Sequence, residues 1–325
     1  MAKTESIFSP PVNSDSTSET QIATTPHQSM WSGRLAVVLA AVLWSTSGFF
    51  AKAPWFDGWS ADLRGMQLAF WRSFFAAIAL MPFIRKPKWH PAILPTSIAF
   101  AIMLWSFMTA MVHGPAANAI WLQYLAPTWV LIFGVAFLGE RVTQSDLTMF
   151  VCCLSGVVLI LAMEMRSGSS LYATGMGVLS SLMYATVILL MRKMRDQDPA
   201  WLITLNHVAT VLIMLPWVWS QPLNQVAPGA YVALALFGIF QLSVPYIIFC
   251  RALRTVSSPE ASILTLIEPI ILPLWVYIAW RNHESYQPPQ WWTLAGGGLI
   301  FVGLLIRYLP MLIRSKKRVQ ESNTP

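Results

Sequence analysis

Ten apolar runs, each about 20 residues long, follow one another along most of the 325-residue chain. A helix of about 20 residues crosses the roughly 30 Å of hydrocarbon in a bilayer and satisfies its own backbone hydrogen bonds there. Because the runs lack the alternation of barrel strands, they predict an all-α polytopic membrane protein with ten transmembrane helices. The predicted spans are 33–53, 64–84, 91–113, 117–138, 144–164, 171–191, 199–220, 229–250, 258–280 and 290–313.

The composition excludes an ordinary water-soluble domain. Hydrophobic residues make up 56% of the chain and charged residues only 11%, whereas soluble domains carry about 25% charged residues. The net charge of +7 does not indicate a nucleic-acid partner, because the basic residues lie in short clusters between the apolar runs. No metal or other cofactor is expected, since the three cysteines, Cys152, Cys153 and Cys250, lie in apolar runs without metal-ligand spacing.

The basic residues beside the spans predict the orientation of the chain. Fourteen lysines and arginines flank the span ends on the side of the N-terminus, and four flank the other ends. Positive residues stay on the cytoplasmic side, so both termini are predicted to be cytoplasmic in a cell (inner) membrane. The segment 1–30, rich in Ser and Thr, is predicted to be a disordered tail, and 314–325 a basic cytoplasmic tail.

The second half of the chain repeats the first at an offset near 140 residues. Pro127 in the fourth span corresponds to Pro269 in the ninth, and this is one of five pairs that follow the same order. Each repeat, 33–164 and 171–313, holds five spans. An odd number of spans inserts the two copies in opposite orientations, which is typical of secondary transporters that work by alternating access.

Short motifs in both halves resemble a known family. The Leu-Ala-Pro at 125–127 and the Gly-Glu-Arg-Val-Thr at 139–143 are similar to the end of the first domain of EamA-type members of the drug/metabolite transporter superfamily, and the Ile-Glu-Pro at 267–269 is similar to the second copy. The resemblance covers about residues 33–313, although the second copy departs from the pattern at 281–284. It implies a carrier of two inverted five-helix repeats, usually an exporter of small organic metabolites.

Glu268 is the most informative candidate for the substrate site, because it is the only acidic residue well away from the ends of the predicted spans. An ionised carboxylate at the bilayer centre costs about 2.5–3.5 kcal/mol, so Glu268 should face the interior or be protonated. Pro269 follows it and removes a helix hydrogen bond, and Pro127 and Pro245 are predicted to kink two other spans. The prediction is a site for a substrate cation or a proton, and the alternative is a structural Glu at a kink.

Arg72 is the main buried cation of the predicted spans, and its role stays open between three alternatives. In the first alternative Arg72 pairs with Glu268, because two opposite charges at similar depth are more stable together than apart. Alternatively, it bonds helix-end carbonyls and serves folding alone, or it contacts an anionic group of the substrate. His207 in the seventh span is predicted to form an interhelical hydrogen bond.

The other candidate substrate residues are polar or aromatic side chains inside the spans. In the fourth span, a spacing of 3.6 residues per turn places Asn118, Trp121 and Thr128 on one face and displaces Gln123 and Tyr124 from it. Interhelical hydrogen bonding or simple packing is the alternative for each of them. The complete candidate set is Glu268, Trp44, Trp105, Asn118, Trp121, Tyr184, Gln241 and Tyr246.

These features predict a transporter of small organic metabolites or amphipathic drugs, and the family resemblance suggests export. Aromatic walls with one carboxylate suit an amphipathic neutral, zwitterionic or cationic metabolite, through stacking and cation–π attraction. The expected partners are this metabolite and membrane lipid, while proton coupling through Glu268 and a homodimer stay open. An enzyme is not expected. One alternative is an intramembrane serine protease, suggested by the run Ser45-Thr46-Ser47-Gly48 and by His207, although Ser45 stands where the motif needs glycine. The other is a receptor or scaffold, which would not need an inverted repeat.

Overall fold

The computed structural model describes residues 26–139, 141–168, 170–222, 225–284 and 286–322. Every regular element in this part of the chain is a helix, and ten helical segments are long and apolar enough to cross a membrane. The predicted class and span count are therefore confirmed, and no span end differs from the predicted one by more than three residues. The ten spans are Trp31–Ala51, Ala61–Phe83, Ile93–His113, Ala116–Phe137, Gln144–Ser167, Leu171–Arg192, Pro199–Trp219, Pro228–Ala252, Glu260–Trp280 and Trp291–Pro310.

Six of these spans are built on one continuous helix each, and four are interrupted. The continuous helices are α3 (Ala61–Leu80), α4 (Ile93–His113), α7 (Gln144–Ser167), α8 (Leu171–Arg192), α9 (Pro199–Trp219) and α14 (Trp291–Ser322). The interrupted spans are α1 (Pro26–Ser45) with α2 (Ser47–Ala51), α5 (Ala116–Gln123) with α6 (Ala126–Leu138), α10 (Pro228–Leu236) with the π-helix η4 (Phe237–Ser243) and α11 (Val244–Ala252), and α12 (Ser258–Thr265) with α13 (Glu268–Trp280). Two 3-10 turns, η1 (Pro54–Phe56) and η2 (Met81–Phe83), lie at either end of α3.

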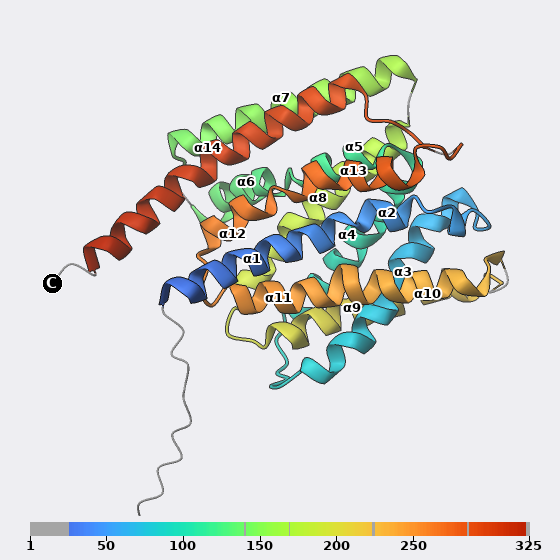
Figure 1. Ribbon diagram of the computed structural model, residues 1–325, viewed down its shortest axis with the longest axis horizontal. Helices are drawn as coiled ribbons and strands as arrows, with labels where there is room; N and C mark the ends of the chain where they lie inside the picture. Colours follow the sequence, from blue (N-terminus) through green and yellow to red (C-terminus); the bar gives the residue numbers. More distant parts are fainter. Residues whose placement is uncertain (1–25, 140, 169, 223–224, 285, 323–325) are drawn as a thin grey trace, which may run out of the picture.

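The helices lie roughly along one direction, and the start of α1 and the end of α14 meet at the same end of the bundle (Figure 1). We call this the terminal end, and we call the end that carries the loops 52–60 and 286–290 the opposite end. Of the two predicted tails, residues 1–25 lie outside the described part of the chain. The helix α14 continues to Ser322 and so includes most of the segment predicted as a basic tail.

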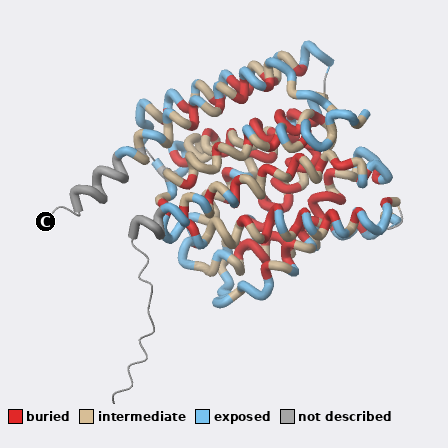
Figure 2. Tube along the Cα trace, viewed as in Figure 1, coloured by how far each residue is buried: buried red, intermediate tan, exposed pale blue. Residues whose placement is uncertain are grey.

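The core lies along the middle of the bundle, where buried residues from many helices meet (Figure 2). The most buried span is α4, which packs against α3, α8 and α9. At the edge of the bundle, α7 and α14 lie side by side, and a Cβ atom at Gly156 or Gly296 would collide with the carbonyl oxygen of the other residue. Glycine at both positions therefore allows a close approach of the two backbones.

Two ion pairs hold helices together at the terminal end. Arg307 in α14 contacts Asp146 in α7 at 2.7 Å, and Arg34 in α1 contacts Glu260 in α12 at 2.6 Å. The Asp146 side chain also forms a capping box with Thr143 at the start of α7, an arrangement that satisfies backbone N–H groups without a helical partner. These contacts join α14 to α7 and α1 to α12 at the terminal end.

Candidate functional site

A cavity of about 420 Å³ lies inside the bundle and reaches from Glu268 towards the terminal end, where Leu253 and Ser258 line it. We call it the Glu268 cavity. Five of the eight predicted substrate residues line it, and so do Arg72, Pro127 and several aromatic and polar residues that were not in the predicted set. The lining includes Trp44, Arg72, Phe107, Gln123, Tyr124, Tyr184, Gln241, Tyr246, Glu268 and Tyr308.

Glu268 lies where the ninth span breaks. The helix α12 ends at Thr265, and α13 begins at Glu268 with Pro269 in its first turn. Proline lacks an N–H group, and its ring excludes a bond to the carbonyl four residues earlier, which here is Thr265. The phenolic hydroxyl of Tyr124 donates to that carbonyl at 2.8 Å and contacts the Glu268 carboxylate oxygen Oε2 at 3.0 Å. Two hydrogen-bond acceptors, the Thr265 carbonyl and the Glu268 carboxylate, therefore lie at the break, and Tyr124 contacts both.

The fourth span breaks in the same way. Its two helices have 8 and 13 residues, as do the two helices of the ninth span, and every boundary in the ninth span lies 142 residues after its counterpart. Pro127, in the first turn of α6, is the counterpart of Pro269. Tyr124 follows the end of α5, so its side chain reaches from one break to the other. The two breaks meet at the Glu268 cavity.

Arg72 lines the same cavity but does not pair with Glu268. Its side chain is 1% exposed, and its guanidinium carbon lies 5.2 Å from the centroid of the Phe237 ring. Within the described part of the chain, no ion pair or hydrogen bond joins Arg72 to a carboxylate or to a helix-end carbonyl, and its Nε has no partner. The structure thus favours neither the predicted ion pair nor the purely structural alternative.

The π-helix η4 places Gln241 and Tyr246 at the cavity. Pro245 has no N–H for the carbonyl of Gln241, four residues earlier, and the wider helical turn directly precedes it. Gln241 donates its Nε2 to the Trp44 carbonyl at 3.2 Å, and its Oε1 is buried without a hydrogen-bond partner. The Trp44 ring contacts those of Tyr246 and Phe249, with centroids 5.4 and 5.2 Å apart. These rings form an aromatic wall with a free amide oxygen beside it.

Three predicted substrate residues lie elsewhere. Trp105 packs against the main hydrophobic core. Trp121 belongs to a second hydrophobic cluster with residues of α14, and the centroids of its ring and the Phe301 ring are 6.4 Å apart. Both are large apolar rings that fill space between helices, as the packing alternative proposed. Asn118 lines a different cavity, which is at the opposite end of the bundle.

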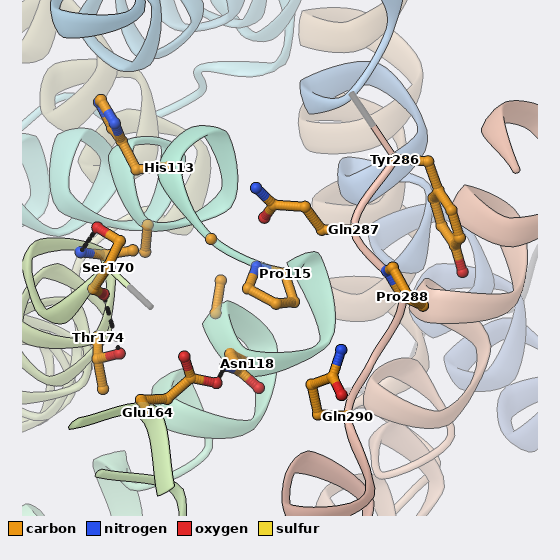
Figure 3. A pocket seen from close by; sticks show the side chains of 14 residues that line it. His113, Pro115, Asn118, Glu164, Ser170, Thr174, Tyr286, Gln287, Pro288 and Gln290 are labelled. Carbon is orange, nitrogen blue, oxygen red and sulfur yellow. Dashed lines mark hydrogen bonds between the residues drawn. The ribbon is translucent and has the colours of Figure 1, made fainter. Parts of the chain in front are cut away.

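That second cavity, of about 370 Å³, contains a buried carboxylate that is not among the predicted site residues (Figure 3). Glu164 is the last residue of the predicted fifth span, but α7 continues to Ser167 and leaves Glu164 only 2% exposed. Its Oε1 accepts hydrogen bonds from Asn118 Nδ2 at 2.7 Å and Trp292 Nε1 at 2.9 Å. Thr293 in turn donates to Asn118 Oδ1 at 2.5 Å. Glu268 is therefore not the only acidic residue of the spans that lies inside the bundle.

The residues that suggested a serine protease do not form a catalytic pair. Ser47 is the serine of that motif, and its Oγ is buried without a hydrogen-bond partner in the described part of the chain. Ser45, at the glycine position, donates to the Val42 carbonyl at 2.7 Å. The His207 ring lies 5.0 Å from that of Phe100, and neither of its nitrogens has a hydrogen-bond partner. The predicted interhelical hydrogen bond of His207 is thus wrong for the described part of the chain, where the ring packs against Phe100 instead.

Comparison with known proteins agrees with this architecture. The model of the EamA-like transporter family matches residues 31–162 and 171–309. A transporter of Archaeoglobus fulgidus, described as uncharacterized, is 28% identical over 279 residues, which cover 85% of this chain and 96% of that protein. The pseudopaline exporter CntI of Pseudomonas aeruginosa (strain UCBPP-PA14) is 24% identical over 293 residues, or 88% of this chain and 97% of CntI.

A similar fold is also known from a solved structure, described only as "Crystal structure of protein". It aligns with 86% of this chain and 98% of its own chain, with a TM-score of 0.57 and 16% sequence identity. At this identity the likeness concerns the fold alone.

Proposed function

This chain belongs to the EamA-like transporter family, and we propose that this membrane transporter exports a small amphipathic metabolite that carries both a basic nitrogen and an acidic group. The observation that supports this most directly is that Glu268 and Arg72, which carry opposite charges, line one aromatic-walled cavity without forming an ion pair with each other. Its named relatives are transporters, which supports a non-enzymatic role.

The charges of the cavity favour a zwitterion over a neutral or purely cationic ligand. An isolated charge within the bilayer costs about 2.5–3.5 kcal/mol, and pairing would offset this cost. Glu268 and Arg72 line one cavity without forming an ion pair there. A ligand with a basic nitrogen for Glu268 and an acidic group for Arg72 would neutralise both, while Trp44 and Tyr246 would stack on its apolar part.

Alternating access would follow from two five-helix halves, 33–164 and 171–313, inserted in opposite orientations. The matched breaks before Pro127 and Pro269 support this arrangement, since the two spans have the same pattern of helix lengths. Interrupted helices near the middle of a transporter let one half move against the other around a site between them.

We place the terminal end in the cytoplasm, because most of the basic flanking residues lie there. The Glu268 cavity extends towards this end, so a cytoplasmic metabolite would reach Glu268 directly. The resemblance to a protein named as an exporter supports the same direction. A bacterial or archaeal protein of this kind would work in the cell (inner) membrane.

Proton coupling is consistent with the contact between Tyr124 and Glu268. A phenolic hydroxyl has one hydrogen, but two acceptors, the Thr265 carbonyl and Glu268 Oε2, lie within reach. When Glu268 is protonated, its own O–H can donate to the phenolic oxygen while Tyr124 donates to Thr265. Both protonation states of Glu268 would then be satisfied, so a proton could replace the ligand there.

The test uses the purified full-length chain and a set of amphipathic L-amino acids with their N-acetyl and methyl-ester derivatives. We expect a ligand that raises the unfolding temperature of the wild type but not of Glu268→Gln, and loses its effect when its amine is acetylated. The methyl ester should lose the contribution of Arg72 and bind wild type and Arg72→Gln equally. Counterflow of that ligand in proteoliposomes then tests transport. Identical thermal shifts for wild type and both variants would exclude this site.

A further inference from the structure

The cavity around Glu164 holds a buried carboxylate with one oxygen free. Asn118 and Trp292 both donate to Oε1. The other oxygen, Oε2, has no hydrogen-bond partner within the described part of the chain. In Figure 3 the Glu164 side chain extends along the cavity next to Asn118, with one carboxylate oxygen directed away from it. This oxygen is not fully enclosed by protein, so it is open to the cavity that Glu164 lines.

A purely structural role does not account for this arrangement. Asn118, Trp292 and Thr293 already join α5, α7 and α14, and they use only Oε1. An amide in place of the carboxylate could accept the same two hydrogen bonds through its oxygen without burying a charge. The charge of Glu164 therefore needs a partner that the network itself does not supply.

The rest of the lining indicates the charge of that partner. The residues that line the cavity include Gln287, Gln290, Ser170 and Thr174, whose oxygens can accept hydrogen bonds, and the aromatic ring of Tyr286. No lysine or arginine is among the described residues that line it. A carboxylate with neutral acceptors and an aromatic ring is suited to a cationic nitrogen. The Glu268 cavity differs from it in containing Arg72.

The two cavities lie at the two ends of one short helix. Asn118 is in the first turn of α5, and Tyr124 directly follows its last residue. Six residues of α-helix extend about 9 Å, so α5 links the partner of Glu164 to the partner of Glu268. A displacement of α5 would therefore change both sites together.

We propose that the Glu164 cavity is a second binding site, which takes the cationic nitrogen of the exported metabolite after it leaves the Glu268 cavity. This assignment rests on the proposed function, because it makes the two cavities successive stations of one pathway. The second site favours the cation over the acidic group, because Glu164 and His113 are the only ionisable side chains besides Tyr286 among the described residues that line it. Release to the opposite side of the membrane would then begin with loss of the contact to Arg72.

Calorimetric titration of the purified full-length chain with 2-phenylethylammonium, a cation without an acidic group, tests this proposal. We expect two binding events in the wild type, of which Glu164→Gln loses one and Glu268→Gln loses the other, each by at least tenfold in affinity. The anion 3-phenylpropionate should not bind at the second site. The matched control is Glu284→Gln, which removes an exposed carboxylate at the same end of the bundle and should keep both events.

The outcomes separate the second site from the proposed function. One event that is lost in Glu268→Gln and unchanged in Glu164→Gln overturns the second site and leaves the proposed function standing. An event that is lost only in Glu164→Gln supports the second site and contradicts the role of Glu268. If Glu164→Gln does not fold, Gln290→Lys replaces it. Its tethered ammonium should occupy the cavity and remove the same event, and unchanged binding would again overturn the proposal.

Discussion

Spans four and nine are interrupted near their middles, whereas α7 and α14 continue without a break and lie side by side along the edge of the bundle (Figure 1). The interrupted spans bring Tyr124 and Glu268 together at a cavity. The continuous helices meet through Gly156 and Gly296 and through the ion pair of Arg307 with Asp146. The comparison suggests that broken backbone supplies polar groups for a ligand, while unbroken helices with small contact residues hold the bundle together.

Glu268→Gln should have the largest effect on transport. A hydrogen bond to a charged group contributes about 1.5–3 kcal/mol, so replacing the carboxylate by an amide should weaken ligand binding on the order of fiftyfold. Transport in proteoliposomes measures the loss. The matched variant in the same span is Glu260→Gln, which removes the charge of the partly buried ion pair with Arg34 outside the cavity and should leave transport near the wild-type rate. Equal loss in both variants would mean that the break at Glu268 has no special role.

Gly296→Ala should reduce stability more than any change at the breaks. The new Cβ would meet the carbonyl oxygen of Gly156, and backbone cannot move aside without separating α7 from α14. Overpacking of this kind costs about 1–3 kcal/mol, which a lower unfolding temperature in detergent would report. The control on the same helix is Gly298→Ala, because nothing lies near a Cβ at that position. If both variants unfold at the same temperature, the glycine contact does not hold the helices.

Tyr124→Phe should have a smaller effect, confined to the breaks. It removes the hydroxyl that joins Thr265 and Glu268, and a neutral hydrogen bond contributes about 0.5–1.5 kcal/mol, so ligand affinity should fall about threefold to tenfold. If Tyr124 supports proton exchange at Glu268, the variant should also change the pH dependence of transport. Tyr172→Phe, on an exposed tyrosine at the start of α8, is the control. An unchanged pH profile with unchanged affinity would remove Tyr124 from the mechanism.

Much of the fold follows from the sequence, because hydrophobic length is a direct physical requirement of the bilayer. The ten spans, and Glu268 as a buried carboxylate next to Pro269, could be read from the order of residues alone. The two proline positions also indicated where helices would be interrupted.

Which side chains near the breaks line the Glu268 cavity could not be predicted from the sequence. Projection onto a straight helix placed Asn118 and Trp121 on one face and displaced Gln123 and Tyr124 from it. The helix α5 ends at Gln123, so the projection applies to Gln123 but not to Tyr124. Both of these residues line the Glu268 cavity, away from Asn118. The proline four residues after Gln123 was the signal that the projection should stop there.

Glu164 was missed for a different reason. A span boundary drawn at 164 places its carboxylate at the membrane surface, whereas three further residues of α7 bring it beneath the loop that contains Tyr286 and Gln287. The sequence does not show that Asn118 and Trp292, from distant spans, converge on it. Contacts of this kind depend on how the helices pack, which hydropathy does not encode.

A buried lysine close to the break in the first span should make the stability of the protein depend on pH. Lys52 follows α2, the short helix after this break, and its Nζ lies 3.4 Å from the Val112 carbonyl. Burial, together with the nearby charge of Arg64, lowers the pKa of Lys52 from 10.5 to about 8. Between these values the unfolded chain binds a proton that the folded chain has released, so stability should rise as the pH increases from 8 to 10.5.

Lys52→Met should therefore be more stable than the wild type near neutral pH, and the rise between pH 8 and 10.5 should be smaller in this variant. Unfolding temperatures at pH 7.5, 9 and 10 measure both effects. Lys193→Met, at an exposed lysine that follows the continuous helix α8, should keep the wild-type dependence. If the unfolding temperature of Lys52→Met rises with pH as steeply as that of the wild type, the Lys52 ammonium stays hydrated in the folded chain. The difference between interrupted and continuous spans would then concern only the polar groups at the Glu268 cavity.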